Sequence, residues 1–233
     1  MIQIFSAQTA HVFDHGWLKG SHLFSFGDYY DPENTAFGPM RVFNDDTIAP
    51  GKGFGAHPHS DMEIVSIVLA GTLRHEDNLG NVAESGFGGI QRMSAGTGVI
   101  HTEHNPSAEE PVRLLQLWFM PGTRGTAPSY RAGRYDPEKL HGRLLPVVSP
   151  EGGAEVMDIA QDMTIYLGRA GNGQELTFRQ AEGRRVFLYL IDGRLRLNGE
   201  HHLAPGDSAR IVEVGELTLS ADEDSLVMLI DLP

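Results

Sequence analysis

The chain has 233 residues, no cysteine and a formal net charge of −13, from 18 Lys and Arg against 31 Asp and Glu. This charge disfavours electrostatic binding to nucleic acid or to anionic lipid. The absence of cysteine excludes disulfides, thiolate metal sites and cysteine nucleophiles. The first residues lack the basic start and apolar stretch of a signal peptide, and no apolar run approaches the ~18 residues that span a bilayer, so we expect a cytoplasmic protein.

Short apolar runs of strand length recur along the chain, and each is bounded by Gly, Pro, Asn or Asp. They lie at residues 63–71, 112–120, 163–168, 186–193 and 225–233. No segment shows a sustained period of about 3.6 residues with helix caps. With 28 Gly and 13 Pro to form turns, the sequence predicts an all-β fold of many short strands, a sandwich or a barrel.

A segment rich in Gly, Pro and charge at residues 121–153 is typical of a connection between domains. We therefore predict an N-terminal domain at residues 1–135 and a C-terminal domain at residues 136–233.

The two predicted domains share a weak internal repeat. Residues 63–74 align with residues 185–196, and residues 89–103 align with residues 206–220, with glycines at matching positions in both alignments. One strand-turn-strand unit therefore occurs twice, and two copies of one β-barrel would explain both matches.

The segment GFGAHPHSDME, residues 53–63, places two histidines one residue apart. Alternate side chains of a strand share a face, so His57 and His59 point the same way. Further along, VIHTEHN gives His101 and Glu103 the same spacing. A single H-x-H pair among 11 histidines is more often a solvent-facing strand pattern than a metal site, but a second alternating pair favours a metal site.

The repeat alignment strengthens this interpretation, because all four candidate ligands are missing from the second copy. The aligned residues are Arg179, Ala181, Thr218 and Ser220. Loss of one shared site would leave this pattern. The other histidines, His75 and His104 among them, are expected to be surface or hydrogen-bonded structural residues.

These residues resemble the cupin superfamily. Its first motif, G-x5-H-x-H-x(3,4)-E-x6-G, is followed closely by Gly51, His57, His59, Glu63 and Gly71. The second motif, G-x5-P-x-G-x2-H-x3-N, is met at its final glycine, histidine and asparagine, with glycine in place of the usual proline: Gly98, His101, Asn105 and Gly96. Strand parity puts Glu63 out of register for a metal, and Glu103 can supply the missing carboxylate.

That replacement resembles one cupin family, the pirins, and the segments 15–32, 53–71 and 93–106 look like pirin signatures. The resemblance implies a bicupin, two tandem antiparallel barrels of jelly-roll type, with a metal site in the N-terminal barrel only. It also implies that four residues match the pirin metal ligands, which usually hold iron: His57, His59, His101 and Glu103.

Imidazoles plus one carboxylate suit Fe(II), Mn(II), Co(II), Ni(II) or Zn(II), and ligand type alone does not choose among them. The resemblance implies quercetin 2,3-dioxygenase activity, in which O2 cleaves the central ring of a flavonol and carbon monoxide is lost. Glu103 is expected to act as both a ligand and a catalytic base. We expect a monomer that binds neither nucleic acid nor membranes.

Two alternatives stay open at this point. The first is a non-enzymatic, iron-dependent regulator of the pirin type that binds a protein partner. The second is a cupin enzyme that acts on another enol substrate.

Overall fold

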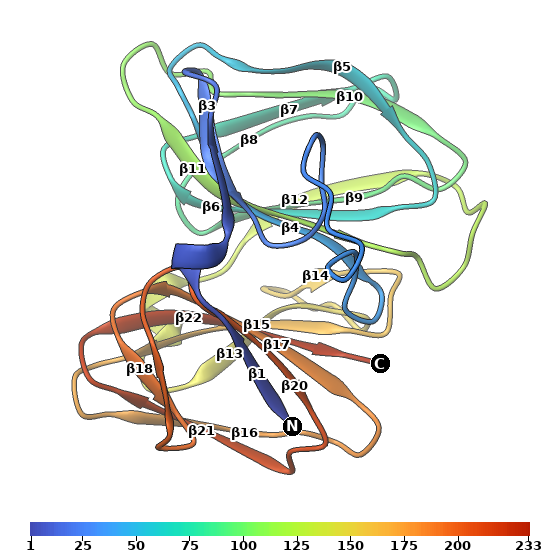
Figure 1. The fold of residues 1–233 in the computed structure, drawn as a ribbon. Coiled ribbons are helices and arrows are strands. Elements are labelled where there is room, and N and C mark those ends of the chain that lie inside the picture. Colours follow the sequence, from blue (N-terminus) through green and yellow to red (C-terminus); the bar gives the residue numbers. More distant parts are fainter. The chain divides into compact units, whose positions relative to one another are not determined.

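The computed structural model describes all 233 residues, and strands dominate it. Its helices are two short 3-10 turns, η1 (Ala7–Thr9) and η2 (Pro137–Leu140). No helix has the length and apolar character needed to cross a membrane. The prediction of an all-β fold is confirmed (Figure 1).

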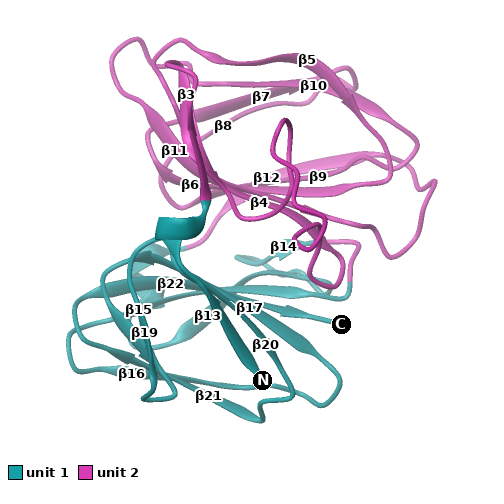
Figure 2. Ribbon diagram, viewed as in Figure 1, with its two compact units in different colours: residues 1–10, 136–158, 162–233 teal, residues 11–135, 159–161 magenta.

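The chain divides into two compact units (Figure 2). Unit 1 consists of residues 1–10, 136–158 and 162–233, and unit 2 consists of residues 11–135 and 159–161. These units differ from the predicted domains, residues 1–135 and 136–233, in two short segments: residues 1–10 lie in unit 1 and residues 159–161 lie in unit 2. The first ten residues belong to unit 1 because β1 (Ile2–Phe5) pairs antiparallel with β20 (Ser208–Val212).

Unit 2 contains two antiparallel sheets. The larger sheet has seven strands in the order β12 (Ser129–Arg134), β9 (Gly89–Ser94), β6 (Glu63–Ala70), β11 (Val112–Phe119), β4 (Met40–Ile48), β3 (Leu18–His22) and β2 (His11–Asp14). The smaller sheet has four strands in the order β5 (Gly53–His59), β10 (Val99–His104), β7 (Leu73–Asp77) and β8 (Val82–Ser85). Buried side chains of both sheets meet in one apolar cluster, in which Leu73 of β7 packs with Val112 and Leu114 of β11.

Unit 1 repeats this arrangement. Its larger sheet has the order β1, β20, β17 (Arg185–Asp192), β22 (Ser225–Leu232), β15 (Thr164–Ala170), β13 (Leu144–Ser149) and β14 (Met157–Asp158). Its smaller sheet has the order β16 (Glu175–Arg179), β21 (Glu216–Ala221), β18 (Leu195–Leu197) and β19 (His201–Leu203). The two units match in the inner strands of the larger sheet and in the whole smaller sheet, but they differ at both edges of the larger sheet. At one edge β1 takes the place that β12 holds in unit 2. At the other edge β14 pairs parallel with β13, whereas β2 pairs antiparallel with β3.

The predicted repeat of 63–74 on 185–196 is confirmed by the backbone. Gly71 and Gly193 both follow the third strand of the larger sheet, β6 or β17, and both have a positive φ, 72° and 85°. A side chain at either glycine would collide with a neighbouring backbone carbonyl, that of Pro111 or of Asp224. Glycine is therefore required at the same corner of each unit.

The predicted alignment of residues 89–103 with residues 206–220 is wrong by one residue at Glu103. Glu103 pairs with His75 in unit 2, and Leu219 pairs with the matching residue Leu197 in unit 1. The connection from β20 to β21 is shorter than that from β9 to β10, which shifts the register. By ladder position, the counterparts of His57, His101 and Glu103 are Phe178, Leu217 and Leu219. The sequence alignment instead matches these three residues with Arg179, Thr218 and Ser220. His59 has no counterpart in a strand of unit 1, because β16 ends before that position.

Candidate metal centre

A bulge in β5 directs the two histidines of the H-x-H pair into unit 2. Phe54 pairs with Glu103 and His57 pairs with His101, so β5 has one more residue than β10 over this stretch. An extra residue reverses the alternation of faces. As a result His57 and His59 lie on the same face as Phe54 and meet His101, whereas an unbroken ladder would have turned them to the opposite face.

The three imidazoles form a compact cluster. The ring centroids of His57 and His59 are 4.9 Å apart, those of His57 and His101 are 4.4 Å apart, and those of His59 and His101 are 4.9 Å apart. Their candidate ligand atoms all lie within 4.8 Å of one another. The predicted convergence of these histidines is confirmed, and His101 lies on β10, opposite His57.

The free ring nitrogens of the cluster suit a divalent ion. Nε2 of His59 and Nε2 of His101 are buried without a hydrogen-bond partner. Nδ1 of His57 lies 2.7 Å from the carbonyl oxygen of Gly55, which makes Nδ1 the donor and leaves the lone pair on Nε2. Orphaned buried acceptors are costly, so the two on His59 and His101, with the lone pair of His57 beside them, fit a bound cation.

Burial keeps the imidazoles of His59 and His101 neutral. It lowers the pKa of His59 to about 4, with a further contribution from His57, and lowers the pKa of His101 to about 3, with contributions from the neighbouring histidines. A metal binds the neutral form of imidazole. Both rings therefore keep their lone pairs available through the physiological pH range.

Glu103 is buried beside His101 and forms with His75 and His101 a second group of potential ligands, which shares His101 with the first group. Its Oε1 lies 3.1 Å from the hydroxyl of Ser66, and its Oε2 accepts a hydrogen bond of 2.8 Å from Nε2 of Gln116. Burial raises the pKa of the Glu103 carboxyl, and the hydrogen bonds partly oppose that shift.

Glu63 belongs to neither cluster. Its carboxylate accepts a hydrogen bond of 2.7 Å from Ser94. This agrees with the interpretation, drawn from strand parity, that Glu63 is out of register for the metal.

Two aromatic side chains line the surroundings of the histidines. Trp118 meets His59 edge to face at 4.7 Å, and Tyr130 stacks on His75 at 4.0 Å. The indole Nε1 of Trp118 and the hydroxyl of Tyr130 are buried without a partner. The sequence did not indicate either residue, because Trp118 lies in an apolar strand where an aromatic is typical of core and Tyr130 lies in a polar segment that looks like a connection between domains.

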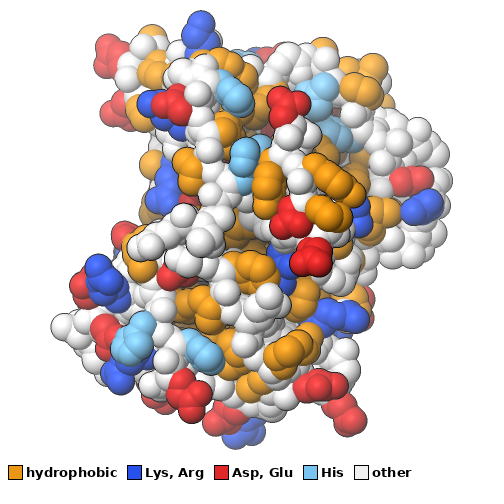
Figure 3. Space-filling model, in the orientation of Figure 1, with side chains coloured by type: hydrophobic (Ala, Val, Ile, Leu, Met, Phe, Trp, Pro, Cys, Tyr) orange, Lys and Arg blue, Asp and Glu red, His pale blue; other side chains and the backbone are white.

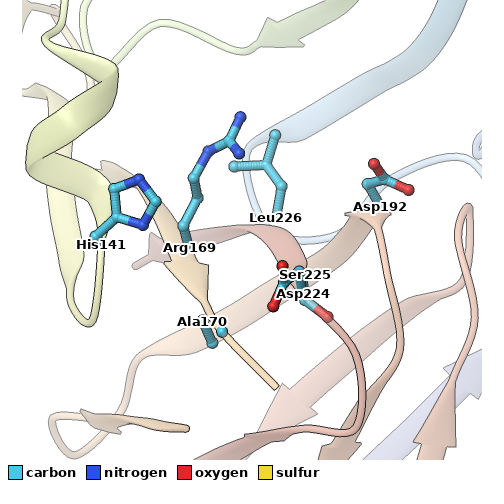
Figure 4. A pocket seen from close by; sticks show the side chains of 8 residues that line it. His141, Arg169, Ala170, Asp192, Asp224, Ser225 and Leu226 are labelled. Carbon is cyan, nitrogen blue, oxygen red and sulfur yellow. The ribbon is translucent and has the colours of Figure 1, made fainter.

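Unit 1 contains a pocket whose lining residues form no cluster of three potential metal ligands, unlike the histidine cluster of unit 2 (Figure 4). Its volume is about 220 Å³, and Arg169, His141 and Asp192 contribute to its lining. In Figure 4 the side chains of Arg169 and Asp192 extend from separate strands. Asp192 accepts a hydrogen bond from the turn residue Gly193. Both clusters of three metal-ligating side chains lie in unit 2.

Charged side chains are mixed over the face of the molecule shown in Figure 3. Acidic and basic groups lie next to one another there, and no continuous basic area is visible.

Comparison with known proteins gives consistent results over the whole chain. A family model described as Pirin matches residues 5–119, and one described as Quercetinase C-terminal cupin domain matches residues 146–232. Quercetin 2,3-dioxygenase of Escherichia coli strain K12 is 40% identical over 233 residues, covering 100% of this chain and 99% of that protein. A putative quercetin 2,3-dioxygenase of Pseudomonas aeruginosa is 38% identical over 220 residues, 94% of each chain.

Solved structures show the same relationship. The bacterial pirin YhhW from Escherichia coli, in complex with nickel(II), has a TM-score of 0.94 and 39% identity and covers 100% of this chain and 99% of that one. The fold is therefore a bicupin with its histidine cluster in the N-terminal half, as predicted.

Proposed function

Because the chain belongs to the pirin family, we propose that it is a metal-dependent dioxygenase that uses O2 to cleave the central ring of a flavonol such as quercetin, with release of carbon monoxide. The observation that carries this proposal is the cluster of His57, His59 and His101, in which Nε2 of His59 and Nε2 of His101 are buried without a partner and a buried carboxylate lies beside His101. The names of the bacterial relatives, which are 38–40% identical over nearly their full lengths, support the same reaction.

In this proposal His57, His59 and His101 hold one divalent ion, and Glu103 is its fourth ligand. When bound, such an ion supplies Lewis acidity and, if it is iron, the redox chemistry that O2 requires. We propose Fe(II) as the native metal. The ligand set also suits Zn, Mn, Co and Ni, and the nickel(II) complex of the Escherichia coli pirin is an example of the last.

The surroundings of Glu103 suit a group that takes up a proton. The single hydroxyl proton of Ser66 has two acceptors in reach, Oε1 of Glu103 at 3.1 Å and Oε1 of Gln116 at 2.5 Å. When Glu103 is protonated at Oε1, it donates to Ser66, Ser66 donates to Gln116, and Gln116 donates back to Oε2 of Glu103. Every polar group in this ring is then satisfied, and the raised pKa of Glu103 favours that form.

We therefore assign Glu103 the role of catalytic base for the 3-hydroxyl of the flavonol. Removing that proton makes the substrate electron-rich and ready to react with O2. Ser66 and Gln116 are positioning residues that hold the carboxyl group.

The first test is oxygen uptake with quercetin by iron-reconstituted protein, run beside metal-free protein and a His59→Ala variant. We expect uptake that requires both metal and His59 and that matches flavonol loss and carbon monoxide release. No uptake by protein with a confirmed full complement of iron would contradict the proposed reaction.

The role of Glu103 is tested separately by Glu103→Gln, which keeps the shape and the hydrogen bond to Ser66 while removing the base. Turnover is expected to fall by about 100-fold or more, within the range of general-base catalysis, with a much smaller loss of bound metal. An equal loss of turnover and metal would show that Glu103 is only a ligand.

A further inference from the structure

A second buried imidazole lies behind His101, on the side away from the free Nε2. Nδ1 of His75 is 3.2 Å from Nδ1 of His101, and Nε2 of His75 is 3.3 Å from Oδ2 of Asp77. His75 is 2% exposed, and the side chain of Asp77 is fully buried. The three side chains thus form a continuous line from a buried carboxylate to a candidate metal ligand.

Strand register places the three residues. On β7, His75 and Asp77 are two residues apart and share a face. On the neighbouring β10, His101 pairs with Asp77 and Glu103 pairs with His75. The alternation of polar side chains on two adjacent strands therefore builds the line without any irregular backbone.

Asp77 and His75 are both held firmly. Oδ1 of Asp77 accepts hydrogen bonds from the backbone N–H groups of Leu79 at 2.9 Å and Asn81 at 3.0 Å, and Oδ2 accepts one from the Asn81 side chain at 2.8 Å. The ring of His75 stacks on Tyr130 with an interplanar angle of 11°. Neither group can turn away from its neighbour without breaking these contacts.

The hydrogen bonds permit one consistent assignment of protons. Asp77, as a carboxylate, only accepts, so Nε2 of His75 must donate to it. Nδ1 of a neutral His75 is then an acceptor, and Nδ1 of His101 must donate to it. This leaves Nε2 of His101 without a proton, and Nε2 is the buried atom that has no hydrogen-bond partner.

We propose that Asp77 and His75 form a positioning pair for His101, fixing its tautomer and orientation so that Nε2 offers its lone pair to the metal. This inference rests on the metal site of the proposed function. His57 is oriented by a neutral acceptor, the carbonyl of Gly55, whereas His101 is backed by an imidazole that a carboxylate polarises. Such outer hydrogen bonds raise the basicity of a ligand, and their loss typically lowers metal affinity by about 10- to 100-fold.

The tautomers are tested directly by long-range 1H–15N NMR of the histidine rings in Zn(II)-loaded protein, with assignments from single histidine variants. We expect His75 to carry its proton on Nε2 and His101 to carry its proton on Nδ1. A proton on Nδ1 of His75 would overturn the proposal, since that atom could not then accept from His101.

Metal affinity provides the second test, measured by competition between protein and a chelator for Zn(II). His75→Leu removes the acceptor for His101 and is expected to weaken binding by about 10- to 100-fold. His75→Gln supplies an amide oxygen as a substitute acceptor and is expected to recover part of that loss. Thermal unfolding of each metal-free variant shows whether the fold is retained.

The turn that carries Asp77 needs its own control. Leu79→Ala changes an exposed side chain of the same turn and keeps the backbone N–H that donates to Asp77, so its Zn(II) affinity should stay close to that of the wild type. Equal affinity losses in the Leu and Gln variants would overturn the proposal. A stoichiometry of two ions per wild-type chain that falls to one in His75→Leu would also overturn it, by making His75 a ligand. The readout is metal binding, so it is independent of any failure of flavonol turnover.

Discussion

Unit 1 and unit 2 have the same strand order but opposite interiors. In unit 2 the inward positions of the smaller sheet hold the histidine cluster and Glu103. The corresponding positions of unit 1 hold Leu197, Leu217 and Leu219, which are fully or almost fully buried in one apolar cluster. The barrel is therefore a scaffold that tolerates either interior, and the chemistry depends on a few inward side chains.

The backbones differ where the chemistry begins. Strand β5 carries the bulge that turns His57 and His59 inward, and its counterpart β16 pairs with β21 without any irregularity. Bulges often re-aim side chains next to active sites. The local backbone and the residue types thus differ together between the two units.

The largest expected effect comes from placing the carboxylate of unit 2 in unit 1. Leu219→Glu would put a carboxyl group at the position of Glu103, but the counterparts of Ser66 and Gln116 there are Leu188 and Leu229. An unpartnered buried carboxyl should cost roughly 5 kcal/mol of stability at neutral pH.

Thermal and urea unfolding measure this loss, with Leu219→Met as the control that conserves volume. The loss should shrink at acidic pH, where the carboxyl is protonated. A Leu219→Glu variant as stable as the Met variant would contradict the difference between the two interiors.

The next effect concerns Asp46 of β4, a buried acid that is 4% exposed and faces the polar interior of unit 2. Burial, together with Asp45 and Glu103, raises the pKa of Asp46 to about 7. The unfolded chain releases this proton near pH 3.8, before the folded chain does, so stability falls as the pH rises from about 4 to 7.

Asp46→Asn removes that titration. In metal-free protein it should raise the free energy of unfolding by up to ~4 kcal/mol at pH 8, with no gain near pH 4. Asp28→Asn, at an exposed position, is the control. A gain that does not depend on pH would show that the titration of Asp46 is not its cause.

Removing one imidazole from the cluster tests where the metal lies. His59→Ala should weaken Zn(II) binding by more than 100-fold, about 3 kcal/mol, since it deletes a ligand rather than a supporting hydrogen bond. His202→Ala, at an exposed position on β19 of unit 1, should leave affinity and stoichiometry unchanged. A larger loss of Zn(II) affinity in His202→Ala than in His59→Ala would place the metal in unit 1 and contradict the proposed site.

The smallest effect is expected at His104, which follows Glu103 on β10 and faces the other side of the sheet. It is partly exposed, whereas Glu103 is buried. His104→Ala should change stability by no more than about 0.5 kcal/mol and leave metal affinity as it is. A loss of metal would contradict the strand alternation on which the site is built.

The sequence was sufficient to predict the all-β class, the strands β6, β11, β15, β17 and β22, and the convergence of His57, His59 and His101, and the repeat together with the pirin resemblance predicted two barrels. Alternation along a strand is a local property, and the repeat was visible in the glycines that both copies need. The two glycines and the proline of residues 53–59 are compatible with a bulge, but its position in β5 was not predictable, because only the pairing with β10 reveals it. The role of His75 was missed because it depends on the register of β7 against β10, which involves two segments far apart in the chain.

The predicted N-terminal domain, residues 1–135, included residues 1–10, which the structure places in unit 1. This difference also depends on a pairing between distant segments. Residues 2–5 form an ordinary apolar strand, and nothing in them indicates pairing with β20, some 200 residues later.

The most direct test of the account is anomalous diffraction, at the iron absorption edge, from crystals of iron-reconstituted protein. The account predicts one ion per chain, bound in unit 2 by Nε2 of His57, His59 and His101. An ion in unit 1, or an ion in unit 2 that does not contact these three imidazoles, would contradict it.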